Sequence, residues 1–149
     1  MVAYDSWSEK PLPLIDAESR EYWERAAAGE LVIQSCDACG ELQFYPRSVC
    51  RHCWSDAVSF IEHDGMGLVY SFTVNHIPGA AGYAEETPYV VGLIELASGE
   101  SNPSGRPVRM TSHFVNCETE NIEVGMPVQV TFRDIQEEPR IALPVFEPA

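Results

Sequence analysis

The pattern of apolar and polar positions separates a short helical segment from a long β-rich remainder. Between residues 17 and 28, one face at helical spacing carries Tyr22, Trp23, Ala26 and Ala27. Asp16 precedes this segment as an N-cap, and Gly29 follows it as the residue type that commonly ends a helix. The pattern therefore predicts one amphipathic helix near the N-terminus.

Short apolar segments separated by turn residues predict strands in the rest of the chain. Three of them, at 31–35, 41–46 and 58–63, flank two cysteine pairs and are typical of a metal-binding ribbon. Five more follow at 67–76, 88–97, 107–115, 126–135 and 140–146, with loops at 77–88, 98–106 and 116–125. Five strands over this length favour a small closed barrel of the OB type.

The expected fold class is therefore mainly β: an N-terminal helix, a rubredoxin-like zinc ribbon and a five-stranded OB-fold barrel. We expect a first domain at 1–64, with helix and ribbon, and a second at 65–149, with the barrel and a C-terminal tail. Gly65, Gly67 and Gly92 are expected to provide the kinks that let strands coil around a barrel.

Four of the five cysteines form the pattern C-x2-C-x10-C-x2-C at Cys36, Cys39, Cys50 and Cys53. Two such pairs on tight turns place four thiolates at the corners of a tetrahedron, which predicts bound zinc, with rubredoxin-like iron as the minor alternative. Four protein ligands leave no position for water, so the metal is expected to be structural. We interpret His52 as a surface residue and Cys117 as a partly buried small apolar one.

The charge of the chain is strongly acidic, with 23 Asp and Glu against 9 Lys and Arg, a net charge of -14. Nucleic acid is therefore an unexpected partner, because a phosphate backbone is normally held by clustered cations. No run of about 18 apolar residues and no basic leader is present, so we expect a cytoplasmic protein without a membrane partner.

With these elements in order, the chain resembles the acyl-CoA-associated family that joins a zinc ribbon to an OB fold, long catalogued as a domain of unknown function. The residues that carry the resemblance are Trp23, Gly29, Leu31, CDACG at 36–40, Pro46, Arg47, Cys50, Cys53, Gly65, Gly67, Tyr70, Ser71, Thr73, Pro88, Tyr89, Glu95, Leu96, Gly125, Val128, Pro144 and Phe146. Arg51 and Trp54 depart from the Pro and Gly that the family usually has, which argues against the usual tight turn there.

The resemblance implies an accessory subunit in a hetero-oligomer with a thiolase-like enzyme that holds most of the CoA thioester substrate. Within the family, the chain is most similar to the partners of retro-aldolases that shorten steroid side chains. The alternatives are a subunit of an acetyl-CoA acetyltransferase or acyltransferase complex, a nucleic-acid-binding ribbon with an OB barrel, and an iron-loaded electron carrier.

The catalytic residues are expected on the larger partner, and we expect no turnover from this chain alone. The candidates for independent catalysis are His63, His76, His113, Glu95 and Cys117, and no pattern unites them. The candidates for contact with partner or substrate are Arg47 on the ribbon, Trp54 after the fourth cysteine, Tyr83 and Tyr89 near the 77–88 loop, and Phe146 as an anchor in the tail.

Overall fold

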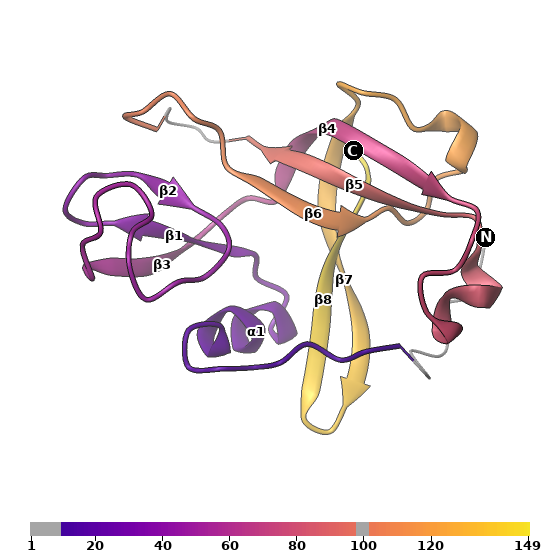
Figure 1. Cartoon of the computed structure of the whole chain (residues 1–149), viewed down its shortest axis with the longest axis horizontal. Helices are drawn as coiled ribbons and strands as arrows, with labels where there is room; N and C mark the ends of the chain where they lie inside the picture. The colour runs from indigo at the N-terminus through magenta and orange to yellow at the C-terminus, as the bar shows by residue number, and fades with distance from the viewer. Residues whose placement is uncertain (1–9, 98–101) are drawn as a thin grey trace.

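The computed structural model describes residues 10–97 and 102–149 and places a small ribbon beside a barrel (Figure 1). The elements are α1 (Arg20–Ala27), β1 (Val32–Cys36), β2 (Leu42–Gln43), β3 (Val58–Glu62), β4 (Met66–Asn75), η1 (Ala81–Glu86), β5 (Tyr89–Leu96), β6 (Arg109–His113), η2 (Thr119–Asn121), β7 (Pro127–Glu137) and β8 (Arg140–Pro148). The fold class predicted from the sequence is confirmed. No helix in these described ranges is long and apolar enough to cross a membrane.

Helix α1 begins three residues later than the sequence predicted, because Asp16 closes a turn before the helix. Its carboxylate accepts hydrogen bonds from the Ser19 backbone N–H at 2.9 Å and from the Ser19 hydroxyl at 2.7 Å. At the other end, Gly29 has φ +82 and donates to the Ala26 carbonyl at 3.0 Å. The Glu30 N–H donates to the Arg25 carbonyl at 2.9 Å. This pair of bonds is the Schellman ending that the glycine predicted.

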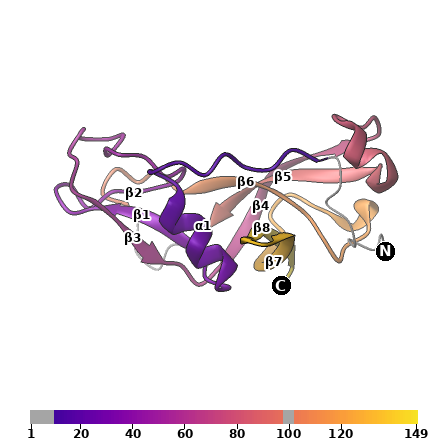
Figure 2. The same cartoon turned by 90° about the horizontal axis from the view of Figure 1, so that it is seen from below.

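The ribbon is a three-stranded antiparallel sheet with the order β2-β1-β3. Its central strand β1 is buried over Val32, Ile33 and Gln34, whereas the outer strand β3 is largely exposed. The helix α1 lies between this sheet and the β7–β8 hairpin (Figure 1, Figure 2). It contacts β1 on one side and β7 and β8 on the other, so it joins the two sheets.

The barrel is an antiparallel sheet with the order β6-β5-β4-β7-β8. A parallel bridge between Phe114 and Phe146 connects the end of β6 to β8 and closes the sheet, which gives the OB-type barrel. The pairing of β4 with β5 shifts between Val69 and Ser71, and that of β7 with β8 shifts between Asp134 and Gln136. These bulges bend the long strands around the barrel.

The structure gives Gly92 a packing role, whereas its predicted role as a kink stays a prediction. Gly92 is regularly paired with Phe72 and Ser112, and a Cβ at this position would overlap the Phe114 ring. Its function is to make room for that ring inside the barrel.

The ribbon and the barrel share one continuous apolar core, which runs from Tyr22, Leu31 and Phe44 near the ribbon to the barrel interior. The division of the chain into two domains near residue 64 stays a prediction.

Candidate metal centre and barrel cavity

The four predicted cysteines come together at one end of the ribbon. Their sulfur atoms all lie within 4.8 Å of one another, and Cys36–Cys53 and Cys39–Cys50 are separated by 3.6 and 3.7 Å. A tetrahedral zinc site with Zn–S bonds of about 2.3 Å has sulfur–sulfur edges of about 3.8 Å. The cluster therefore has the size of a tetrathiolate metal site, and the arrangement is consistent with bound metal.

Two similar turns present the cysteine pairs. In the first, the Gly40 N–H donates to the Cys36 carbonyl at 2.8 Å, and in the second the Trp54 N–H donates to the Cys50 carbonyl at 2.9 Å. Gly40 has φ +78, and Trp54 adopts nearly the same conformation with φ +66. The tight turn therefore forms although the usual glycine is replaced, at a conformational cost that a bulky residue with positive φ carries.

The ionisation of these thiols is unequal before a metal binds. Burial opposes ionisation of Cys50, but the N–H groups of Cys53 and His52 outweigh it and lower its pKa to about 7. The Glu41 N–H favours the Cys39 thiolate, yet burial and the other three thiols raise the pKa of Cys39 to about 12. Four thiolates at this spacing repel one another, so a divalent cation is needed to hold all four deprotonated.

Two buried glutamines hydrogen bond to the backbone of the segment that contains the third cysteine. The Gln34 side chain accepts from the Arg47 N–H and donates to the Arg47 carbonyl, both at 2.9 Å. The Gln43 side chain accepts from the Arg51 N–H at 2.9 Å and donates to the Val49 carbonyl at 3.2 Å. The two amides also bond to each other at 2.8 Å, so the whole segment 47–51 has a fixed backbone.

The loop between β5 and β6 docks the barrel onto the ribbon. The Asn102 side chain accepts from the Leu42 N–H at 2.8 Å and donates to the Leu42 carbonyl at 3.3 Å, as a neighbouring strand would. Nearby, the buried Glu41 carboxylate accepts hydrogen bonds from the backbone and the hydroxyl of Ser104. Sequence reasoning missed these residues, because nothing in their local pattern shows which strand they will meet.

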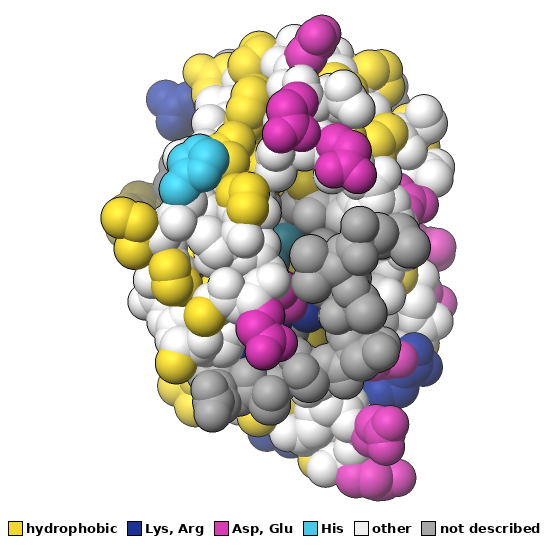
Figure 3. Space-filling model, turned by 90° about the vertical axis from the view of Figure 1, so that its right-hand side faces the viewer, with side chains coloured by type: hydrophobic (Ala, Val, Ile, Leu, Met, Phe, Trp, Pro, Cys, Tyr) yellow, Lys and Arg dark blue, Asp and Glu magenta, His cyan; other side chains and the backbone are white. Residues whose placement is uncertain are grey.

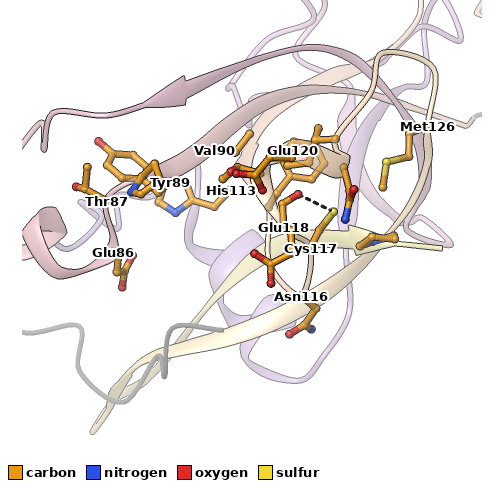
Figure 4. Close-up of a pocket in the computed structure, with 16 residues that line it drawn as sticks. Glu86, Thr87, Tyr89, Val90, His113, Asn116, Cys117, Glu118, Glu120 and Met126 are labelled. Atoms are coloured by element: carbon orange, nitrogen blue, oxygen red, sulfur yellow. Dashed lines mark hydrogen bonds between the residues drawn. The ribbon is translucent and has the colours of Figure 1, made fainter.

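A cavity of about 780 Å³ opens at the opposite end of the barrel (Figure 4). Its wall includes Tyr89, Val90 and His113 from the strands, and its rim includes Glu118 and Glu120 from the η2 loop. The surface seen from this end is hollowed at its centre, with acidic side chains above the hollow and at its lower left edge (Figure 3). The cavity thus joins an aromatic wall to an acidic rim.

Tyr89 and His113, which line this cavity, form an aromatic cluster with Tyr83 next to it. Tyr83 stacks on Tyr89 with ring centroids 4.9 Å apart, and its ring meets His113 at 5.6 Å. Burial and the nearby Arg133 lower the pKa of His113, so the imidazole is neutral near pH 7. Behind the rings, Glu86 forms ion pairs with Lys10 and, at 2.7 Å, with Arg133. These pairs fix the end of the η1 segment to Lys10 and to β7.

The predicted contact residues do not form one site. Tyr83 and Tyr89 lie together at the cavity, whereas Arg47 and Trp54 are exposed on the ribbon. The prediction that Phe146 anchors a partner does not fit the structure. Phe146 lies within β8, is 0% exposed and fills the barrel core, so its side chain cannot reach a partner. Two prolines near Phe146, Pro144 and Pro148, are typical of an extended tail. In the structure, both are paired with residues of β7.

The five candidate catalytic residues are also dispersed. His113 and Cys117 line the barrel cavity, and Glu95 pairs with Arg109 on the outside of the barrel. His63 lies at the ribbon–barrel junction, where its Nδ1 accepts from the Gly65 N–H at 3.0 Å. His76 is exposed beyond the end of β4.

Both parts of the chain match known protein families. The ChsH2 rubredoxin-like zinc ribbon domain matches residues 23–59, and the ChsH2 C-terminal OB-fold domain matches residues 61–133. A DUF35 domain-containing scaffold protein of Methanocaldococcus jannaschii is 32% identical over 104 residues, which are 69% of this chain and 67% of that protein.

Larger curated relatives contain a similar module. A probable enoyl-CoA hydratase alpha subunit of Thermomonospora curvata is 36% identical over 94% of this chain. A 3-oxo-4,17-pregnadiene-20-carboxyl-CoA hydratase alpha subunit of Mycobacterium tuberculosis is 30% identical over 82% of this chain. The chain spans only 40% and 36% of the length of these two relatives.

Two solved structures share the fold. A chain of the Ltp2-ChsH2(DUF35) aldolase superposes with a TM-score of 0.76 at 36% identity, covering 92% of this chain and 98% of that one. A DUF35 protein of unknown function from Sulfolobus solfataricus superposes with a TM-score of 0.57 at 16% identity, covering 89% of this chain and 86% of that one, a likeness of fold alone.

Proposed function

Because this chain belongs to the ChsH2/DUF35 family, we propose that it is the accessory subunit of a thiolase-like enzyme acting on CoA thioesters. The reaction that we favour is the retro-aldol cleavage of steroid side-chain CoA thioesters. The observation that carries this proposal is the superposition on nearly the whole DUF35 chain of an aldolase complex at 36% identity.

A CoA hydratase complex is the second candidate. It is favoured by the match of 94% of this chain to part of a hydratase alpha subunit. In both cases the reacting groups would lie on the larger partner, and this chain would contribute folding support and binding surface. The dispersed positions of His63, His76 and Glu95 agree with that division of roles.

We propose that the four cysteines bind one structural zinc ion. The sulfur–sulfur distances of 3.6 and 3.7 Å fit a tetrahedral Zn²⁺, and four thiolate ligands leave no position for a substrate or a reactive water. Zinc would supply the charge that keeps the thiolates together and fix the two turns relative to each other. Metal analysis with the visible spectrum tests the choice between colourless zinc and coloured iron.

Trp54 is our leading candidate for contact with the partner. Its side chain is 77% exposed, and its backbone has the unfavourable φ of +66 that a glycine would adopt more easily. A large apolar side chain kept in water at such a cost supports a role in binding. Arg47, also exposed on the ribbon, is a second candidate, and Tyr83 with Tyr89 would contact partner or substrate at the barrel cavity.

Coexpression with a thiolase-like protein from the same source tests the function. We expect the two chains to copurify, the partner to gain solubility or activity, and this chain alone to show no turnover. Assays with steroid side-chain aldol and enoyl-CoA substrates distinguish the aldolase from the hydratase. A partner that is fully soluble and active without this chain would contradict the accessory role.

A further inference from the structure

Two arginines without an ion pair in the described part of the chain, Arg51 and Arg106, share one pocket of this acidic protein. The cations that form ion pairs are Lys10, Arg25, Arg109, Arg133 and Arg140. Arg51 on the ribbon and Arg106 on the barrel form none within the described residues. Both line one pocket of about 180 Å³, together with His52 and the β2 edge. The two positive charges of the arginines therefore exceed the one negative charge of Glu41 in a pocket where ribbon and barrel meet.

The backbones of both arginines are fixed by one short strand. The Arg51 N–H donates to the buried Gln43 side chain at 2.9 Å. The Arg106 carbonyl accepts from the Asn102 side chain at 2.6 Å, and Asn102 is itself bonded to Leu42. Adjacent residues of β2 thus position arginines that are far apart in the sequence. Such preorganisation lowers the entropic cost of binding a ligand between them.

The single carboxylate in the pocket wall does not occupy the arginines. Glu41 is buried, and its two oxygens accept from the backbone N–H and the hydroxyl of Ser104. Arg51 and Arg106 therefore line the pocket with donors that Glu41 does not use, and with one positive charge more than its negative charge offsets. Planar guanidinium groups bind phosphate oxygens in a bidentate manner, and the net positive charge that two of them leave beside Glu41 favours an anion such as a phosphate monoester.

We propose that this pocket binds the phosphate monoester group of a ligand, with Arg51 and Arg106 as its two cationic contacts. The volume of about 180 Å³ accommodates a phosphate group but not a whole nucleotide. Given the proposed function, on which this identification rests, the ligand is a CoA thioester whose 3'-phosphate lies here while its acyl group lies in the partner. The net charge of -14 opposes anion binding elsewhere on the chain, so this local pocket selects the phosphate end.

The test compares ligands that differ by one phosphate. Titrations of the full metal-loaded chain with CoA, dephospho-CoA and inorganic phosphate, followed by calorimetry, measure the dissociation constants. We expect CoA to bind at least about tenfold more tightly than dephospho-CoA, with phosphate competing, since charge-assisted hydrogen bonds have about that effect. Equal affinity for CoA and dephospho-CoA would overturn the proposal.

Variants assign the effect to the two arginines. Arg51→Gln combined with Arg106→Gln should abolish the preference for CoA, whereas Arg20→Gln, on exposed helix surface, removes the same charge and should retain it. Metal content and melting temperature show whether each variant is folded. If the double variant is folded and keeps the preference, the pocket is not the phosphate site.

Experiments on the complex with the partner distinguish the proposed phosphate site from the proposed accessory function. In the complex, the double variant should still copurify with the partner but show a raised KM for the CoA substrate and an unchanged KM for its dephospho analogue. If it instead loses the partner and keeps its CoA preference, the arginines bind an acidic partner surface and the proposal is wrong. If the wild-type chain binds phosphate at the pocket but no thiolase-like partner, the proposed function fails and the phosphate site stands.

Discussion

The ribbon and the barrel differ in how much regular structure they contain. The ribbon strand β2 has only two residues, whereas β7 has 11 and pairs along most of its length with β8. The barrel also encloses large apolar side chains such as Phe146 and Ile94. A sheet as small as the ribbon cannot bury enough apolar surface to be stable alone, so the cysteine cluster has to supply what the barrel obtains from packing.

The largest effect should follow from loss of the metal. Cys50→Ser removes one of four ligands, and metal binding to such modules contributes on the order of 10 to 16 kcal/mol apparent free energy. We expect the ribbon to lose its structure while barrel amides stay protected from hydrogen exchange. Cys117→Ser, in the barrel, is the control and should keep the metal. A Cys50→Ser protein with full metal content and an unchanged melting profile would refute the assignment.

The barrel should respond most to loss of core volume. Phe146→Ala leaves a cavity where a fully buried ring packs, and such changes cost about 4 kcal/mol. Chemical denaturation should show this loss, while the metal content of the folded protein stays constant. Tyr70→Ala, at a half-exposed ring on β4, is the control and should cost much less. A small effect of Phe146→Ala would mean that the barrel does not depend on this core.

The buried ion pairs behind the cavity make barrel stability depend on pH. Burial alone would raise the pKa of Glu86, but Arg133 and Lys10 hold it below its ordinary value of 4.5. The stabilisation is therefore complete above about pH 4.5 and is lost as the pH falls through the lowered folded pKa. Glu86→Gln leaves two buried cations without their carboxylate and should cost about 3 kcal/mol at pH 7.

Denaturation of Glu86→Gln over a pH series measures both effects. The variant should lose part of the acid dependence of the wild type, because its amide does not titrate. Glu85→Gln, at the exposed neighbouring position, should behave like the wild type. An unchanged acid dependence in Glu86→Gln would assign it to other carboxylates.

A smaller change should separate the two regions without unfolding either. Asn102→Ala removes the hydrogen bonds to Leu42 that join the barrel loop to the ribbon, at a cost of about 2 kcal/mol. We expect ribbon and barrel to exchange amide hydrogens more independently and the ribbon to reorient, as residual dipolar couplings would detect. Asn121→Ala, at an exposed position in η2, is the control. Unchanged couplings in Asn102→Ala would show that the shared core alone sets the orientation.

The smallest expected change is a gain in stability. Trp54→Gly removes the backbone strain at φ +66 and should stabilise the ribbon by about 1 kcal/mol. The same change should weaken the interaction with the partner. Trp54→Ala removes the same ring but keeps most of the strain, so it should weaken binding without the gain. Thermal melts and partner affinity measure the two effects. Full partner affinity in both variants would exclude Trp54 from the interface.

Local patterns explain most of what the sequence predicted correctly. The cysteine spacing brought Cys36, Cys39, Cys50 and Cys53 into one cluster, because each pair lies on one turn. The strand segments followed from alternation and turn residues. The prediction for Phe146 failed because it depended on distant residues: its segment has the sequence of a tail and becomes a strand only by pairing with β7. The start of the helix shifted for a local reason, because Asp16 bonds to Ser19 three positions later. The partner of Asn102 lies 60 positions away and has no local signal.

Lys10 gives the molecule a built-in chemical reporter. It is the only lysine among the 149 residues, its side chain is 1% exposed, and its ammonium lies 5.1 Å from the centre of the Tyr83 ring. The single ε-amine of the chain is therefore shielded from acylating reagents in the folded protein. Modification at Lys10, measured by peptide mass spectrometry, would count the molecules in which the segment that carries it has separated from the Tyr83 ring and Glu86.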